Sequence, residues 1–275
     1  MGAISLYAKP SVNFAQKLAA SRALLIASSA LYPPITQASS LGAEDMVVTH
    51  LISDTRIPSS VFVLDTGMLH AQTLALIGQL EARYGINVEV YRPDAAVAAT
   101  FVADNGNDAM YKSLSLRKTC CDFRKMEPLA RALEGKQAWI TGLRREQSNA
   151  RAEVHDVEHQ PITVNGQPAT RAKINPLADW TWGDVWHFIQ ENKVPYNPLH
   201  DEFFPSIGCA PCTRAVTLGE DFRSGRWWWE QESAKECGLH VEGGHGAGKE
   251  LPAFEALSSP LPPLVSRIPV KEIPA

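Results

Sequence analysis

Short apolar segments alternate with helix-like segments in this chain, and that alternation limits the folds it can adopt. The clearest strand pattern is "SSVFVLDTG" at 59–67, an apolar run that stops at Asp-Thr-Gly. "LHAQTLALIGQLEARYG" at 69–85 has helical spacing and ends in a glycine, which helix C-termini favour. "INVEVYRPD" at 86–94 is the next strand, closed by a proline. Strands separated by helices predict an α/β fold with a mostly parallel, twisted sheet flanked by helices.

Other segments extend this pattern on both sides. The further predicted elements are, in chain order, a helix within 11–29, a rather polar strand at 35–40, a helix within 41–52, helices near 95–103 and at 121–135, a strand at 137–145, a hairpin turn at 164–167 and a helix at 181–193. Thr181 and Asp184 have the spacing of a capping box at the start of the last helix. Parallel sheets of this kind bind their ligands at the carboxyl ends of the strands.

Length and composition fit one large domain or two small ones. The chain has 275 residues and is 45% apolar, which is enough for a full α/β core. We expect an N-terminal helical segment at 1–34, the main domain at 35–242 and a flexible tail at 243–275, because the tail is rich in Gly and Pro.

Charge and cysteine usage limit the function and the compartment. The formal net charge of −4 argues against a generic nucleic-acid or membrane-surface binder. Five cysteines is an odd number, which suits a reducing compartment better than a secreted disulfide framework. The sequence has no apolar run close to the ~20 residues that cross a bilayer. We therefore expect a cytoplasmic protein that binds neither nucleic acid nor membrane.

Four of the cysteines form two pairs. Cys120 and Cys121 are adjacent, so their Cα atoms, ~3.8 Å apart, are too close for an easy disulfide. Cys209 and Cys212 form a Cys-x-x-Cys pair, which zinc, redox dithiols and iron–sulfur centres all use. Adjacent residues cannot easily place both sulfurs on one tetrahedral ion, whereas a [4Fe–4S] cluster offers separate irons. The spacing favours the cluster and leaves zinc as the alternative.

The fifth cysteine, Cys237, lies in the polar segment "EQESAKECGLH". A thiol near its usual pKa of ~8.5 needs a positive neighbourhood to ionise, and Arg223 and Arg226 lie just upstream. Cys237 is therefore a candidate nucleophile, with an inert cysteine as the alternative.

Two regions suggest an anion site. In "ASSLGAEDMVV" at 38–48, a strand enters a Ser- and Gly-containing loop and then a helix, which directs backbone N–H groups toward an anion. Residues 117–151 carry nine Lys and Arg against four Asp and Glu. Arg144, Arg145 and Arg151 follow a predicted strand, where the fold places a ligand, although a solvated basic face is the alternative. The tryptophans at 227–229 favour a core or a partner surface.

Together, these motifs resemble the assimilatory adenylyl-sulfate reductases of the sulfonucleotide reductase family. The resemblance covers roughly 35–240 and is carried by "SSLGAED", "VLDTG", "KTCCDFRKMEPL", "TGLRREQS", "PYNPLH", "GCAPCTRAV", "GRWWWEQ" and "KECGLH". It implies an adenine-nucleotide α-hydrolase-like sheet and adenosine 5′-phosphosulfate as substrate. No thioredoxin-like domain follows in the sequence, so we expect a separate thioredoxin or glutaredoxin to supply the electrons.

The resemblance also implies roles for individual residues. Cys237 matches the nucleophile that forms an S-sulfocysteine, and Lys125 matches a lysine near both cluster and substrate. The implied ligands of a [4Fe–4S] cluster are Cys120, Cys121, Cys209 and Cys212. The residues expected around the phosphosulfate are Arg144, Arg151, Arg223 and Arg226, and those expected in the nucleotide segments are Ser39, Ser40, Gly42, Leu64, Thr66 and Gly67.

Three other functions stay open on the sequence. A reductase that prefers or accepts the 3′-phosphorylated nucleotide is the nearest. A PP-loop ATPase would require a fuller SGGxDS-type loop than "SSLGAED". A zinc-stabilised nucleic-acid module fits the −4 net charge poorly. The sequence also leaves a homo-oligomer open.

Overall fold

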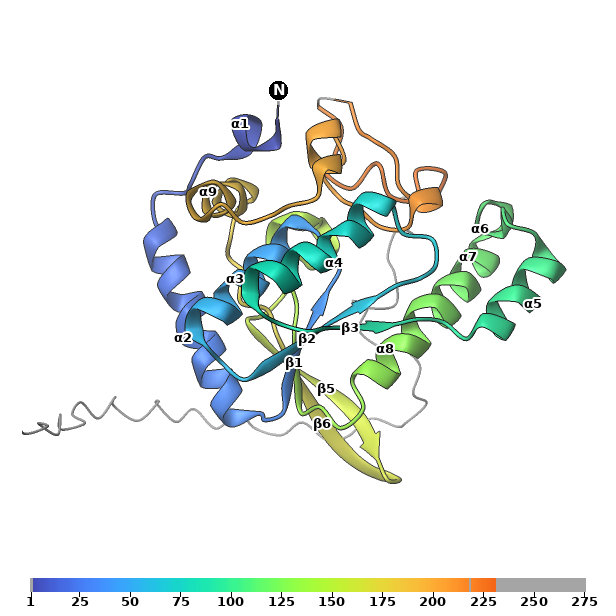
Figure 1. The fold of residues 1–275 in the computed structure, drawn as a ribbon, viewed down its shortest axis with the longest axis horizontal. Coiled ribbons are helices and arrows are strands. Elements are labelled where there is room, and N and C mark those ends of the chain that lie inside the picture. Colours follow the sequence, from blue (N-terminus) through green and yellow to red (C-terminus); the bar gives the residue numbers. More distant parts are fainter. Residues whose placement is uncertain (1, 218, 231–275) are drawn as a thin grey trace, which may run out of the picture. The chain divides into compact units, whose positions relative to one another are not determined.

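The computed structural model describes residues 2–217 and 219–230 (Figure 1). Cys237 and the predicted tail at 243–275 lie outside these residues. The described residues contain a six-stranded sheet with strand order β3-β2-β1-β4-β6-β5. The strands are β1 (Ile35–Ser39), β2 (Ser59–Leu64), β3 (Val88–Tyr91), β4 (Ala138–Ile140), β5 (Val157–Val164) and β6 (Gln167–Ile174).

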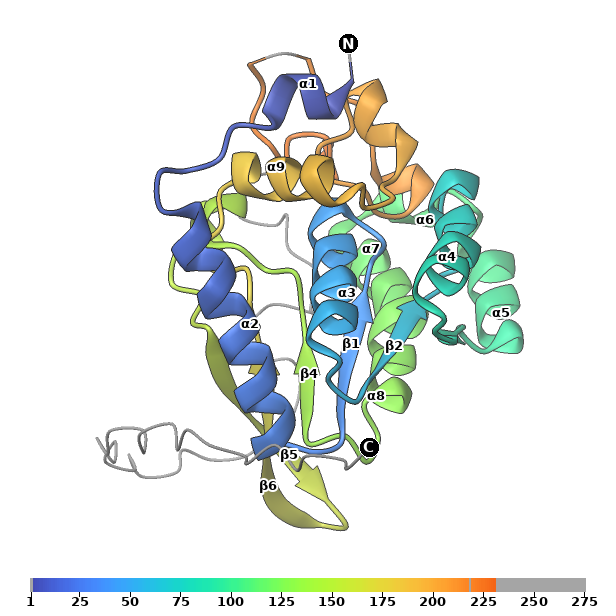
Figure 2. The ribbon, with the colours of Figure 1, turned by 60° about the vertical axis from the view of Figure 1, so that its left-hand side comes forward.

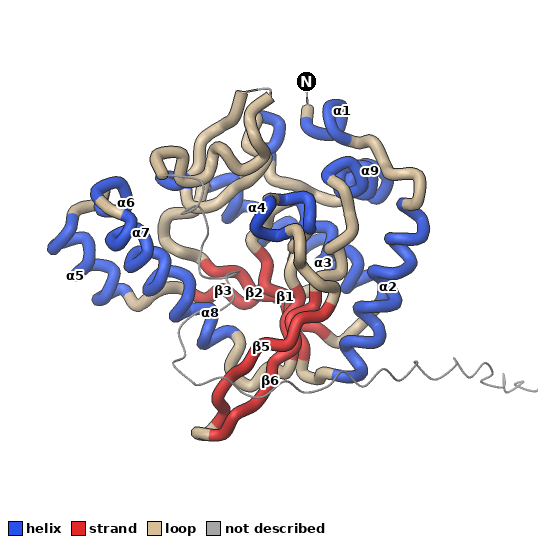
Figure 3. Tube along the Cα trace, turned by 180° about the vertical axis from the view of Figure 1, so that it is seen from behind, coloured by secondary structure: helices blue, strands red, loops and turns tan. Residues whose placement is uncertain are grey.

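The sheet is mostly parallel, as the sequence predicts. β1 pairs in parallel with β2 and β4, β2 pairs with β3, and β4 pairs with β6. Only the edge strand β5 is antiparallel, in the hairpin with β6 (Figure 3). The carboxyl ends of β1, β2 and β4 therefore meet at one edge of the sheet.

Helices cover both faces of the sheet (Figure 2). Since side chains alternate along a strand, Val63 and Ile140 join the core beneath α3, while Phe62 and Trp139 pack against Leu129 of α8. The helices are α1 (Ala3–Tyr7), α2 (Phe14–Leu31), α3 (Ala43–Thr55), α4 (Ala71–Tyr84), α5 (Ala95–Asn105), α6 (Ala109–Lys112), α7 (Leu114–Cys121), α8 (Glu127–Ala132) and α9 (Trp182–Asn192).

The central strand β1 is polar although it is buried. Gln37 donates from Nε2 to the Asp45 carbonyl at 2.8 Å and accepts from the Thr49 hydroxyl at 2.8 Å. These bonds satisfy the buried amide. They also tie the middle of β1 to the first turns of α3.

Several local predictions are confirmed. Thr181 and Asp184 form the capping box of α9, and Gly85 ends α4 with a φ of 64°. The turn at 164–167 joins β5 to β6, with positive φ at Asn165 and Gly166.

The helix predicted at 121–135 differs from the observed one. Only its first residue, Cys121, belongs to α7, which starts at Leu114 because the Ser113 hydroxyl caps it by accepting from the Leu116 N–H at 3.1 Å. A π-helical stretch, Asp122–Met126, then joins α7 to α8. Such stretches often lie at functional sites.

The N-terminal segment shares the main core, where Ala3 and Leu25 are buried together with residues of α3 and α9. Asp184 holds this segment in place. Its carboxylate accepts from the Ser11 N–H at 2.7 Å, from Lys17 Nζ at 2.9 Å and from the Thr181 N–H at 2.9 Å. Within the described ranges, no helix is both long and apolar enough to cross a membrane.

We predict that Asp184→Asn lowers the free energy of unfolding by about 3 kcal/mol at pH 7, because Lys17 loses its buried partner. Burial alone would raise the pKa of Asp184, but hydrogen bonds from Ser11, Thr181 and Lys17 lower it to about 2. This stabilisation is therefore present above pH ~4 and is lost as the pH falls toward 2.

Urea unfolding at pH 7, 4 and 3 measures the difference between the variant and the wild type, which should shrink at pH 3. Asp54→Asn is the control, since the Arg22–Asp54 pair is exposed and should contribute less than about 1 kcal/mol. Equal losses in the two variants would contradict the anchoring role of Asp184.

Candidate functional site

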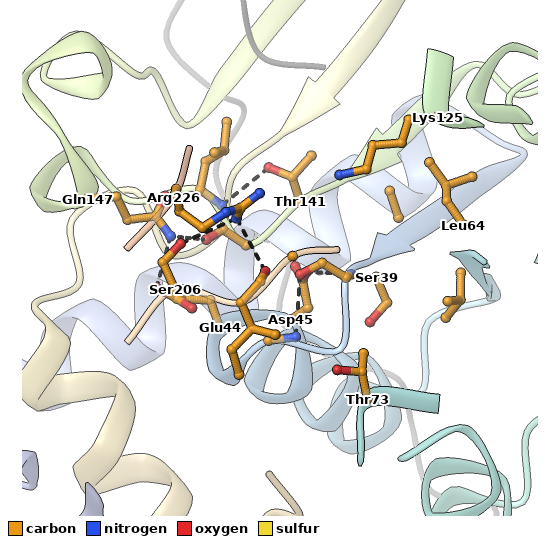
Figure 4. Close-up of a pocket in the computed structure, with 18 of the residues that line it drawn as sticks. Ser39, Glu44, Asp45, Leu64, Thr73, Lys125, Thr141, Gln147, Ser206 and Arg226 are labelled. Carbon is orange, nitrogen blue, oxygen red and sulfur yellow. Dashed lines mark hydrogen bonds between the residues drawn. The ribbon is translucent and has the colours of Figure 1, made fainter. Parts of the chain in front are cut away.

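A cavity opens at the carboxyl ends of β1, β2 and β4 (Figure 4). Its remaining walls come from the first turn of α3, from α8, and from the loops at 205–208 and 222–227. Most of the residues predicted to hold the substrate line it: Ser39, Ser40, Gly42, Leu64, Thr66, Lys125, Arg151, Arg223 and Arg226. Gly67 and Arg144 are not part of this lining.

The loop between β1 and α3 has the geometry of an anion site. Asp45 accepts from the Ser40 N–H at 2.7 Å and from the Ser40 hydroxyl at 2.6 Å, which fixes the loop. Leu41 adopts a positive φ of 61°, and Gly42 caps α3. The first N–H groups and the positive dipole end of this 13-residue helix therefore border the cavity.

Asp45 is buried at the start of α3. Burial raises its pKa to about 6, although the bonds from Ser40 lower it. The two hydrogen bonds from Ser40 partly offset the cost of burying this carboxyl group.

Arg144 lies behind this loop. Its guanidinium is 1% exposed and donates from Nε and Nη2 to Glu44 Oε1, both at 3.0 Å. Nη1 donates to Glu146 at 2.7 Å. The structure thus places Arg144 against the two carboxylates, where it holds the start of α3, rather than in the cavity lining.

Four cationic side chains line the cavity: Lys125, Arg151, Arg223 and Arg226. Figure 4 shows Lys125 and Arg226 pointing into it from different elements. Gly208 lets Arg226 lie close to the backbone, because a Cβ at Gly208 would come within 2.3 Å of the guanidinium. Arg151 Nη1 donates to Gln147 at 2.6 Å, and Gln147 donates to Glu44 at 2.9 Å, which links this arginine to α3. This concentration of positive charge favours an anionic ligand.

The two cysteine pairs meet at a second, smaller cavity. All four thiols line it, together with Met68, Met110, Arg117, Arg124 and Lys125. α7 supplies Cys120 and Cys121, while Cys209 and Cys212 lie on a loop held against Met68 by an Ala210 N–H bond of 2.7 Å. None of these four cysteines forms a disulfide. Lys125 lines both cavities and so connects them.

The arrangement of the possible ligand side chains helps to distinguish a single metal ion from an iron–sulfur cluster. In the part of the chain that the structure describes, no three His, Cys, Asp or Glu side chains converge on one ion. A [4Fe–4S] cluster binds each thiolate at a different iron and does not need such convergence. The Thr66 hydroxyl lies 3.3 Å from the Cys209 sulfur, which is a suitable contact for a thiolate ligand.

Burial opposes the ionisation of two of the thiols, Cys120 and Cys212. Burial raises the pKa of Cys212 to about 12, and Cys209 adds to the effect, while Lys125 and Arg226 reduce it. Burial also raises the pKa of Cys120. Bound iron would supply the positive charge that holds such thiols as thiolates.

Sequence reasoning missed several residues of the larger cavity. Glu44 and Asp45 belong to the quoted "SSLGAED" motif. Acidic residues are favoured in the first turn of a helix, so their position there could have indicated them. Thr141 follows β4, so the strand-end rule could have found it. Gln147 lies in the quoted "TGLRREQS" and His200 in the quoted "PYNPLH", so these motifs are a usable signal for both. Nothing in the local sequence indicates the lining residues Thr73, Ser206 and Phe222.

Comparison with known proteins gives one consistent result. The family model described as "Phosphoadenosine phosphosulfate reductase domain" matches residues 34–215. An adenosine 5′-phosphosulfate reductase from Allochromatium vinosum is 53% identical over 206 residues, which are 75% of this chain and 78% of that protein. One from Burkholderia cepacia is 49% identical over 219 residues, 80% of this chain and 85% of that protein.

Solved structures agree on the fold. A phosphoadenylyl-sulfate reductase from Candida auris, in a phosphate complex, has a TM-score of 0.58 and 27% identity, covering 72% of this chain and 90% of that one. An FMN adenylyltransferase from Candida glabrata has a TM-score of 0.51 at 12% identity, covering 86% and 81%. The latter shares only the fold.

We predict that Gly142→Ala weakens AMP binding by about 1–3 kcal/mol, or roughly 5- to 150-fold. An added Cβ would lie 2.5 Å from Asp45 Oδ1, 2.8 Å from Glu44 Cβ and 3.1 Å from the Asp45 nitrogen. It would therefore displace the start of α3 and the loop before it.

Isothermal titration calorimetry with AMP measures the effect. Gly78→Ala on α4 is the matched control, because its added Cβ meets nothing within 4 Å and should leave the affinity unchanged. Wild-type affinity in the Gly142 variant would show that the loop does not bind the nucleotide.

Proposed function

Because the chain belongs to the phosphoadenosine phosphosulfate reductase domain family, we propose that it reduces adenosine 5′-phosphosulfate to sulfite and AMP in sulfate assimilation. One observation carries the proposal. The cationic cavity at the strand ends shares Lys125 with the cavity of the four cysteines, so an anionic nucleotide would lie beside the cysteine centre.

The lining of the larger cavity offers partners for the adenine, the phosphate and the charge of this substrate. Phe62, Leu64 and Leu129 give an apolar wall for the adenine. The N-terminus of α3 suits the phosphate. The side chains of Lys125, Arg151, Arg223 and Arg226 can balance the charge of the phosphosulfate. As preorganised cations, they would also stabilise charge that develops on the departing phosphate.

The proposed chemistry takes two steps. The Cys237 thiolate attacks the sulfur of the substrate, a sulfur–oxygen bond breaks, and AMP leaves with the electron pair, which produces an S-sulfocysteine. A thiolate of a separate thioredoxin or glutaredoxin then attacks the Cys237 sulfur, and sulfite leaves. The second thiol of that protein resolves the mixed disulfide and restores the Cys237 thiolate. Two thiols thus supply both electrons, which suits a reducing compartment such as the cytoplasm.

A [4Fe–4S] cluster fits the smaller cavity as part of this proposal. Cys120, Cys121, Cys209 and Cys212 would hold it, and Thr66 lies within contact distance of one ligand. The group would supply structural cross-links and a local electric field, since the thiols account for the electrons.

We expect the purified protein to release sulfite from adenosine 5′-phosphosulfate when reduced thioredoxin is present. Without thioredoxin, it should release about one AMP per chain and add one SO₃ to the peptide that contains Cys237. Cys237→Ser should bind AMP with wild-type affinity and release no sulfite. Mass spectrometry and a sulfite assay measure these results.

Comparison with the 3′-phosphorylated nucleotide tests the second candidate, which the description of the matching family model favours. A higher kcat/KM for that nucleotide would assign the chain to the second candidate. The SO₃ group on Cys209 or Cys212, or turnover by the serine variant, would contradict the role of Cys237.

We expect anaerobically purified protein to be brown, with about four irons and four sulfides per chain. Cys121→Ser should lose the iron, the visible absorption and the activity, because one of the four thiolates is missing. Metal analysis and absorption spectra measure this outcome. A colourless, active protein with stoichiometric zinc would overturn the assignment.

A further inference from the structure

A buried ion pair lies beside the cysteine cavity and has no role in the proposed chemistry. Arg117 donates to Glu230 from Nε at 2.9 Å and from Nη2 at 2.8 Å. The side chains are 1% and 7% exposed. A paired, bidentate geometry is what makes so deep a burial of two charges tolerable.

Arg117 belongs to the surroundings of the cysteines. It lies three and four residues before Cys120 and Cys121 on α7, so all three side chains share one helix face. Its side chain lines the cysteine cavity and also hydrogen-bonds the Cys121 side chain. Glu230 comes from a distant segment, directly after the three tryptophans.

The pair contacts Trp227. The guanidinium of Arg117 lies 4.7 Å from the centre of the Trp227 ring, and the Glu230 N–H donates to the Trp227 carbonyl at 2.8 Å. The Trp227 N–H in turn donates to the Cys212 carbonyl at 3.2 Å. Trp227 has a φ of 43°, which is unusual for a bulky residue and persists only where the surroundings hold it.

Trp227 contacts both the cysteine loop and the larger cavity. Its ring packs with Met110, Cys209 and Cys212, and it also lines the larger cavity. The preceding residue, Arg226, has its guanidinium 4.7 Å from the same ring. Any movement of Trp227 would therefore disturb the cysteine loop and the position of Arg226 together.

We propose that Arg117 and Glu230 are positioning residues that hold Trp227, and through it keep the cysteine centre and the Arg226 side of the substrate cavity in register. This inference rests on the proposed function for the identity of the metal centre and of the nucleotide. The alternative is that the pair only stabilises the fold.

The test uses the full chain with its iron centre. Glu230→Gln keeps the volume of the side chain but removes the negative charge that holds the Arg117 guanidinium in place. We expect the half-life of the visible absorption in air to fall at least fivefold and the Kd for AMP to rise at least fivefold. Glu127→Gln is the matched control, since Glu127 also receives a bidentate arginine but on an exposed surface. It should change neither quantity more than twofold.

A second variant separates positioning from stability. Replacing both partners of a buried ion pair by apolar residues often restores stability. The double variant R117M/E230M should therefore regain the wild-type Tm while the centre stays air-sensitive and AMP binding stays weak. The proposal would be overturned if Glu230→Gln kept the wild-type half-life of the visible absorption and the wild-type Kd for AMP. It would also be overturned if the double variant recovered the wild-type Tm, half-life and Kd together.

The same measurements on the wild type distinguish a failure of the proposed function from a failure of the positioning role. If the wild type holds no iron and binds no AMP, the proposed function fails. If it does both and Glu230→Gln matches it, only the positioning role fails.

Discussion

The site depends on the way in which the start of α3 is fixed to the sheet. Gln37, in the middle of β1, holds the Asp45 carbonyl, and the Asp45 carboxylate holds Ser40 on the loop between them. Glu44, the residue before Asp45, accepts from the buried Arg144, which lies in the loop after β4. Burying carboxylates is costly unless hydrogen bonds and opposite charges compensate. Here that compensation also stiffens the loop whose N–H groups border the cavity, so the stability of the fold and the shape of the site have the same origin.

Sequence patterns predicted the features that depend on interactions between residues close together in the chain. The apolar run of β2, the glycine that ends α4 and the capping box of α9 each act within a few residues, and the structure has all three. Even the polar strand β1 was predicted, although its burial was not, because the partners of Gln37 lie on the following helix. The start of α7 was missed for a related reason. Its buried side chains, Arg117 and Cys120, are not typical core residues, so no apolar periodicity marks the helix.

The site shows where prediction from sequence stops. An arginine just after a strand looks the same whether it faces a ligand or a carboxylate. Arg144 and Arg151 were both assigned to the phosphosulfate, yet Arg144 packs against Glu44, one hundred residues earlier in the chain, and only Arg151 lines the cavity. The four paired cysteines do come together, at the smaller cavity. Thr73 and Ser206 had no local signal, since their place in the cavity depends on contacts between distant segments.

The two cavities use some of the same cations, and this makes them electrostatically dependent. Lys125 lines both cavities, and Lys125 and Arg226 are the groups that lower the pKa of the buried Cys212 thiol. An anion bound in the larger cavity would offset part of the positive potential that the cysteines experience. Conversely, negative charge at the cysteine centre would weaken the hold of Lys125 and Arg226 on that anion. In a buried site such interactions are poorly screened, so neither centre can change its charge without altering the other. This dependence follows from the chain itself, since Lys125 lies four residues after Cys121 and Arg226 directly precedes the tryptophan bonded to the Cys212 backbone.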